Sequence, residues 1–177
     1  MVNYLFRTII LSMLLLLLPS ISHAGNSHYT LSPSATTILD RPASILTVDN
    51  EFQLWIPADW EIEENSLKAT DSSLTIWDCS TISFKDNDSM RRAHFEPIGT
   101  TIKSTKQIHF ANLDGQLYEL LVPPGLPMDY ILIYSLYGDK KNYLVFFTCK
   151  ADDFTYYSDA IEAIMKTFKP ITPNQLI

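Results

Sequence analysis

The chain has 177 residues, and its 13 Lys and Arg against 20 Asp and Glu give a formal net charge of −7 at pH 7. Such a length corresponds to one ordinary domain. The acidic balance argues against nucleic acid and anionic lipid headgroups as partners, because both require a positively charged surface. Solubility is the simple explanation of the negative charge, and a cationic partner is the more specific one.

Residues 1–24 have the features of a secretory signal peptide. Arg7 supplies the positive start, residues 8–18 form an apolar run, and small residues precede a cleavage position after Ala24. We therefore expect a periplasmic or secreted protein. The alternative is an uncleaved membrane anchor, but a spanning helix needs about 20 apolar residues, and this run is shorter. No later segment is apolar enough to span a membrane after cleavage.

The rest of the chain divides by composition. Residues 25–43 are rich in Ser, Thr and Pro without a sustained apolar period, which predicts a flexible leader. Residues 44–170 are expected to form a single α+β domain, and residues 171–177 a tail. Between the strands of this domain, residues 86–89 could cap a short helix over 90–93.

Apolar alternation predicts a series of strands. The clearest half-buried one is Phe52–Ile56, which Pro57 ends. Asp114-Gly115 is typical of a hairpin turn, since both central positions of a type I′ turn need positive φ. A second hairpin is expected around residues 138–142, and its two strands are apolar at nearly every position, as in the centre of a covered sheet. The remaining predicted strands cover residues 60–63, 67–70, 74–79, 101–110, 116–122, 130–137 and 143–149.

The strongest helix signal is near the C-terminus. An apolar stripe with helical spacing predicts one buried face; its members are Phe154, Tyr157, Ile161, Ile164 and Phe168. Asp152 and Asp153 stand where carboxylates favour a helix start, and Pro170 stops the helix.

The two cysteines outside the signal, Cys79 and Cys149, lie in separate strand-like segments. In an oxidising compartment thiols tend to pair, so we predict a disulfide between them. The alternative is two buried free thiols, because unpaired Cys packs like a small hydrophobic residue. A redox-active pair is not expected, since no C-x-x-C motif is present.

The order of these elements resembles a known superfamily. An F-x-L-x-I-P strand is followed by Trp60, a hairpin stands near 114–115, and residues 143–170 hold an apolar strand, an Asp-led helix and a final Phe-Lys-Pro. Over roughly residues 50–170, this is similar to the superfamily of the photosystem extrinsic protein PsbP, the periplasmic protein DcrB and the nuclear factor Mog. The resemblance implies an α-β sandwich, with an antiparallel sheet of about six strands covered by helices. It also implies an accessory or binding role without catalysis. A strong second helix is missing, and residues 86–94 or the leader would have to supply it.

The residues give little sign of chemistry. The histidines His28, His94 and His109 lack the spacing of metal ligands. No nucleophile elbow or phosphate-binding glycine cluster occurs. We therefore predict no catalytic residue, no metal and no cofactor.

Aromatic residues are the one surplus, with three Trp, nine Tyr and nine Phe. Trp55 is out of phase with Phe52 and should face the other side of its strand. Packing beneath a helix or loop is the simpler explanation, and an exposed patch for a glycan, peptide or protein is the functional one. The weak binding candidates are Trp55, Trp60, Trp77 and Tyr156.

Three functions remain open. The leading hypothesis is an exported noncatalytic accessory protein that binds another envelope or secreted protein. The second is a small-ligand or lipid carrier with a cavity between sheet and helix, near Trp55 and the loop 123–127. The third is a hydrolase with an unrecognised carboxylate pair. The sequence leaves the oligomeric state open.

Overall fold

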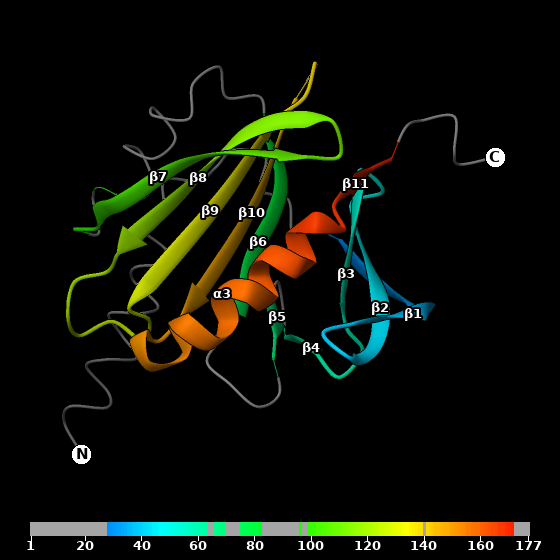
Figure 1. Cartoon of the computed structure of the whole chain (residues 1–177), viewed down its shortest axis with the longest axis horizontal. Coiled ribbons are helices and arrows are strands. Elements are labelled where there is room, and N and C mark those ends of the chain that lie inside the picture. The colour runs from blue at the N-terminus through cyan, green and yellow to red at the C-terminus, as the bar shows by residue number, and fades with distance from the viewer. Residues whose placement is uncertain are drawn as a thin grey trace.

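The computed structural model describes residues 28–63, 66–69, 75–82, 96, 99–139 and 141–171. Within these residues, two antiparallel sheets and the helix α3 (Ala151–Lys166) make up the fold. Figure 1 shows α3 lying across one face of the larger sheet, with the smaller sheet to its side. The expected signal peptide at 1–24 and the short helix at 90–93 lie outside the described residues. Of the expected tail at 171–177, only Ile171 is described, and its backbone N–H donates to the backbone oxygen of Glu51 at 2.8 Å.

The smaller sheet brings the two ends of the domain together. It has the order β1-β2-β3-β11, with β1 (Tyr29–Ile38), β2 (Arg41–Val48), β3 (Phe52–Pro57) and β11 (Lys169–Pro170). Tight turns at Leu39–Asp40 and Asp49–Asn50 join the first three strands, and all four turn residues have positive φ, between 50° and 58°. These turns match the right-handed twist of the strands without using glycine.

The predicted flexible leader is wrong from residue 29 onward. β1 pairs with β2 from Tyr29 opposite Val48 to Ile38 opposite Arg41. Most side chains of β1 are exposed, because an edge strand is held by backbone hydrogen bonds more than by burial. Such a strand carries no apolar alternation, and the domain therefore begins well before residue 44.

The larger sheet has seven strands in the order β4-β5-β6-β10-β9-β8-β7. They are β4 (Glu61–Glu63), β5 (Ser66–Lys68), β6 (Thr75–Ile82), β7 (Thr101–Phe110), β8 (Leu113–Leu121), β9 (Tyr130–Tyr137) and β10 (Asn142–Cys149). The predicted α+β class is confirmed, and so are the two central apolar strands, β9 and β10. The prediction of about six strands in one sheet is corrected to two sheets, of seven and four strands.

The predicted turn at Asp114-Gly115 is displaced by a few residues. The β7–β8 hairpin turns at Ala111 and Asn112, whose φ values are 50° and 63°. Gly115 instead lies inside β8, where an added β-carbon would stand 2.2 Å from the backbone oxygen of Ser135. Glycine is therefore required there for the close approach of β8 to β9, and not for a turn.

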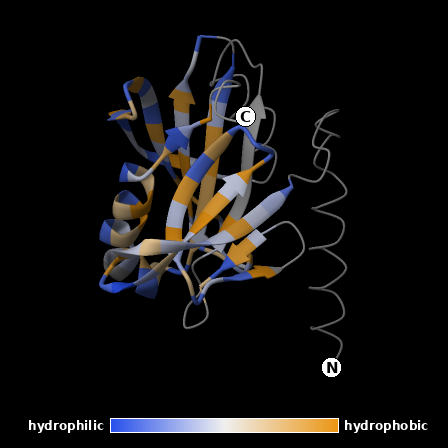
Figure 2. Cartoon of the chain, turned by 90° about the vertical axis from the view of Figure 1, so that its right-hand side faces the viewer, coloured by the Kyte–Doolittle hydropathy of each residue, from blue (hydrophilic) through white to orange (hydrophobic). Residues whose placement is uncertain are grey.

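The helix α3 follows its predicted stripe. Tyr157, Ile161, Ile164 and Phe168 are buried, and Phe154 is partly buried. In Figure 2 the hydrophilic residues of α3 lie on its outer side, away from the sheets. The helix begins with a tertiary cap, because the backbone N–H of Ala151 donates to Asp129 Oδ2 at 2.9 Å.

The main core lies between α3 and the two sheets. Three aromatic rings join these layers. The ring centroid of Phe52 in β3 lies 5.8 Å from that of Tyr143 in β10 and 5.2 Å from that of Phe168, which follows α3. Tyr143 and Phe168 are 5.3 Å apart, so the three form a closed aromatic cluster. A second cluster on the opposite face of the larger sheet contains Tyr118, Leu120, Ile131, Ile133, Leu144 and Phe146.

None of the helices in the described ranges has the length and apolar character needed to cross a membrane.

Candidate functional site

Trp55 lies on the less buried face of β3, where it packs against the margin of the main core. Phe52, Leu54 and Ile56 of β3 are fully buried. Trp55 has the opposite phase, is partly exposed, and lies directly across from Ile45 of β2. The predicted orientation of Trp55 within its strand is thus confirmed, while its binding role stays a prediction.

Two hydrogen bonds fix Trp55 in place. Its indole Nε1–H donates to Ser34 Oγ of β1 at 3.2 Å. Its backbone N–H donates to Thr167 Oγ1 at 2.7 Å, and that hydroxyl in turn donates to the backbone oxygen of Ile164 at 2.6 Å. The short strand β11 pairs only with Phe52 and Gln53 of β3, so Thr167 supplies the acceptor where this pairing ends. The ring is therefore held in place by hydrogen bonds within the chain.

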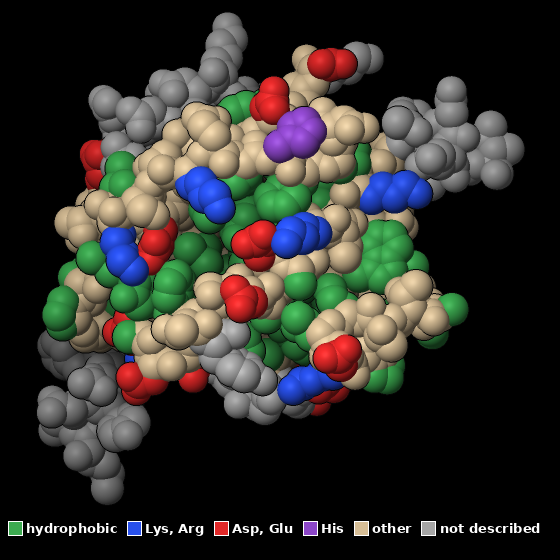
Figure 3. Space-filling model, in the orientation of Figure 1, with side chains coloured by type: hydrophobic (Ala, Val, Ile, Leu, Met, Phe, Trp, Pro, Cys, Tyr) green, Lys and Arg blue, Asp and Glu red, His purple; other side chains and the backbone are tan. Residues whose placement is uncertain are grey.

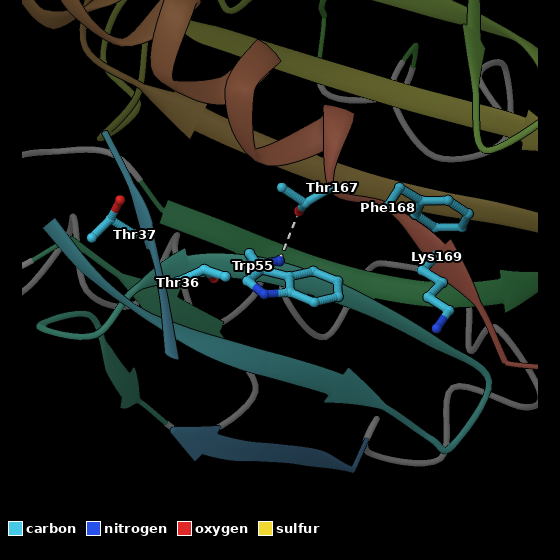
Figure 4. Close-up of a pocket in the computed structure, with 6 residues that line it drawn as sticks. All are labelled: Thr36, Thr37, Trp55, Thr167, Phe168 and Lys169. Carbon is cyan, nitrogen blue, oxygen red and sulfur yellow. Dashed lines mark hydrogen bonds between the residues drawn. The ribbon is translucent and has the colours of Figure 1, made fainter. Parts of the chain in front are cut away.

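The fixed indole lines an open groove of about 420 Å³ between the smaller sheet and the end of α3. Its six lining residues are Thr36, Thr37, Trp55, Thr167, Phe168 and Lys169. Figure 4 shows Trp55 between Thr36 and Thr37 of β1 on one side and Lys169 on the other, with the hydroxyl of Thr167 bonded to its backbone. This lining offers aromatic surface, hydroxyl groups and one ammonium group. None of the six residues carries a carboxylate, imidazole or thiol.

A separate charged cluster ties the β7–β8 hairpin to the start of α3. Lys103 Nζ lies 2.6 Å from Glu119 Oε1, and Ser104 Oγ donates to the other carboxylate oxygen at 2.9 Å. The same ammonium group stands over two rings, 4.8 Å from the centroid of Tyr130 and 5.0 Å from that of Phe154. The hydrogen bond to Glu119 is the main reason that the pKa of Lys103 is raised. Figure 3 shows hydrophobic side chains in the hollow between this hairpin and α3, with charged groups around it.

The other aromatic candidates do not join Trp55 in the groove. Trp60 is only 5% exposed and belongs to the main core, so it is not available as a contact residue. The side chains of Trp77 and Tyr156 lie outside the described residues.

The predicted disulfide between Cys79 and Cys149 is not formed. Cys149 is a free, buried thiol, and the backbone register places Cys79 opposite Val145, four residues from Cys149 along β10. Four strand residues span about 13 Å, whereas bonded cysteines need α-carbons within about 7 Å. Burial, followed by the nearby charges of Asp153 and Asp129, raises the pKa of the Cys149 thiol to about 11.

The remaining candidates from the sequence are also separated from the groove. The loop 123–127 contributes no residue to its lining. His109 Nδ1 lies 2.9 Å from Asp114 Oδ1 at the exposed tip of the β7–β8 hairpin. Within the described part of the chain, no group of three or more His, Cys, Asp or Glu side chains could hold a metal ion.

Ser34 and Thr167 are the residues of the site that the sequence did not reveal. Their hydroxyl groups act on Trp55 from 21 and 112 residues away in the sequence. Isolated Ser and Thr residues are common in loops and strands, so nothing in their local sequence marks such long-range bonds. The one sequence pattern that points to this site is the alternation of apolar residues in β3, which places Trp55 on the opposite face from Phe52.

Comparisons with known proteins bear on the fold. No known family model matches the chain, and no curated protein matches it. The solution structure of cyanobacterial PsbP (CyanoP) from Synechocystis sp. PCC 6803 is similar, with 11% identity and a TM-score of 0.47, over 86% of this chain and 99% of that chain. The crystal structure of a Pseudomonas aeruginosa protein of unknown function is similar at 14% identity and a TM-score of 0.46, over 79% of this chain and 95% of that chain. At these identities and TM-scores, each likeness concerns the fold alone.

Proposed function

We propose that the protein is an exported, noncatalytic accessory protein of the cell envelope that binds another protein at the Trp55 groove. The observation that carries this proposal is the double anchoring of Trp55, by Ser34 at 3.2 Å and by Thr167 at 2.7 Å. A large aromatic ring that is already ordered loses little conformational entropy on binding. Tryptophans in such settings often dominate the energy of protein interfaces.

The chemistry of the groove supports binding over catalysis. Its rings and threonine methyl groups suit an apolar side chain, and Lys169 at the rim suits a neighbouring carboxylate of the partner. A hydrolase site would need carboxylates in reach of the substrate, and the lining supplies none.

Crosslinking from the groove tests the partner. A photoreactive amino acid at Thr37, which is exposed and lines the groove, should capture one discrete envelope protein. The same group at Thr30, exposed on the same strand but outside the groove, is the matched control. Added in excess, the original chain without the photoreactive group should compete for the captured protein and reduce crosslinking. The variant Thr37→Arg, in which the arginine fills the groove, should not compete. Equal capture from Thr37 and Thr30 would contradict the proposal. So would a Thr37→Arg variant that competes as well as the original chain.

The export part of the proposal rests on residues 1–24. Mass spectrometry of protein from the envelope fraction should give a chain that begins at Gly25, directly after the expected cleavage. Recovery of the uncleaved chain from the cytoplasm would contradict export and would leave the groove itself untouched.

A small ligand at the same groove is the second candidate. Its volume of about 420 Å³ is in the range of several hundred cubic ångströms that small-molecule sites have. Native mass spectrometry would then show a retained molecule that Thr37→Arg displaces, together with a failure of crosslinking to any protein.

A further inference from the structure

The outer edge of β7 ends the larger sheet and lies on the other sheet from the Trp55 groove. β7 runs from Thr101 to Phe110 and ends the larger sheet, where it pairs with β8. Side chains from Thr101 to Gln107 are exposed. Within the described ranges, the backbone groups on the far side of β7 have no hydrogen-bond partner. A row of free N–H and C=O groups of this kind is a template for an added strand.

The hairpin geometry tells which amides point outward. The turn at 111–112 has positive φ at both residues, so it closes on the directly hydrogen-bonded pair of Phe110 and Leu113. In an antiparallel pair, alternate residues bond to the neighbouring strand. The N–H groups that face the free edge therefore belong to Thr105, Gln107 and His109.

The charge of β7 selects the partner. The strand contains Lys103, Lys106 and His109 and no acidic residue, although the chain as a whole carries a net charge of −7. Lys103 is engaged by Glu119. Lys106 is the exposed cation in the middle of the edge, and Glu162 of α3 is close enough to interact with its charge. Lys106 lies opposite Leu117, on the face of the sheet that α3 covers.

We propose that β7 accepts an extended, acidic segment of another protein as an additional strand of the larger sheet. Backbone groups of the segment pair with the free edge around Gln107. Carboxylates at alternate positions lie on the same face as Lys106 and pair with it. The alternation follows from the period of two residues in a strand, which places every second side chain on one face.

A second copy of the chain is the less suitable occupant. Two β7 edges paired antiparallel and centred on Lys106 would bring the two Lys106 side chains together, and like charges in opposing positions are destabilising. Lysines on an edge strand are a known protection against such self-pairing.

The test uses a synthetic peptide of alternating threonine and glutamate, and a control peptide in which lysine replaces glutamate. We expect the glutamate peptide to shift the NMR amide signals of Thr105, Gln107 and His109, and the lysine peptide to leave them unchanged. Gln107→Pro removes an outward N–H while sparing the bonds to β8, and it should weaken binding by about tenfold. Gln107→Ala is the matched control and should bind like the original chain.

Lys106→Glu keeps the proposal testable even if Gln107→Pro unfolds the protein. This variant should lose affinity for the glutamate peptide and gain affinity for the lysine peptide. Thr37→Arg should leave peptide binding intact, which separates this site from the Trp55 groove. Equal binding by Gln107→Pro and Gln107→Ala, or no change of preference in Lys106→Glu, overturns the proposal. A concentration-dependent dimer that Gln107→Pro abolishes also overturns it, by assigning the edge to self-association.

Discussion

The hydroxyl of Thr167 accepts a hydrogen bond from the backbone N–H of Trp55 at 2.7 Å, across 112 residues of sequence. It also donates to Ile164, so one side chain both ends α3 and completes the edge of β3. The candidate groove therefore depends on the junction between the helix and the smaller sheet.

Removing this hydroxyl should loosen the groove. We expect Thr167→Val to lower the free energy of unfolding by about 1–3 kcal/mol, since it leaves a partly buried N–H without an acceptor. Thr167→Ser keeps the hydroxyl and should lose much less. Urea unfolding gives the free energies, and tryptophan fluorescence reports the setting of Trp55. Equal stability of the two variants would show that the bond is not important.

The turn at Ala111 should be improved by glycine. Ala111 is exposed and has a φ of 50°, a region in which a β-carbon is strained. Ala111→Gly should raise the stability by about 0.5–1 kcal/mol. Ala58→Gly is a suitable control, because Ala58 is also an exposed turn residue but is not among those with positive φ. Thermal unfolding should therefore show opposite shifts for the two variants.

The start of α3 depends on Asp129. Because its carboxylate accepts the Ala151 N–H at 2.9 Å, Asp129→Ala should cost about 1 kcal/mol, the usual value of a lost helix cap. Asp129→Asn keeps an acceptor oxygen and should cost less. Hydrogen exchange should localise the effect of Asp129→Ala to the first turn of α3. Unchanged exchange there would mean that water replaces the carboxylate.

The buried thiol should make the stability fall at high pH. Burial raises the pKa of Cys149 from 9.0 to about 11, so the fold favours the neutral thiol. Its contribution is complete below pH 9.0 and is lost as the pH rises to about 11. Urea unfolding at about pH 8 and about pH 10.5 should show a steeper loss for the original chain than for Cys149→Ala. Tyrosines and lysines titrate in the same pH range in both proteins, so the difference between the original chain and Cys149→Ala reports on the thiol alone.

The segments that the sequence predicts well are those in which burial imposes a period. Phe52, Leu54 and Ile56 alternate because one face of β3 meets the core, and the stripe from Tyr157 to Phe168 exists because one face of α3 meets the sheets. The apolar strands β9 and β10 were recognised for the same reason, since they are buried along nearly their whole lengths.

Edge strands and turns, which backbone and polar hydrogen bonds stabilise, show no such period of apolar residues in the sequence. β1 is an exposed edge strand, and its pairing with β2 is set by the turn at Leu39–Asp40. The first residue of this turn, Leu39, is not typical of turns with positive φ. The turn at Ala111–Asn112 was hidden by the nearby glycine, which serves the contact with Ser135. The sequence shows that Trp60 is aromatic but not which way its ring turns, so a buried Trp60 and an exposed one look alike at that level.

The two-residue strand β11 pairs with β3, which lies far before it in the sequence. Sheet contacts between such distant segments form late, because the closing of a long loop must precede them. A growing chain that still lacks Thr167 and β11 has neither the fourth strand of the smaller sheet nor the bond that fixes Trp55. The smaller sheet and the Trp55 groove are therefore completed only after these two distant segments have met.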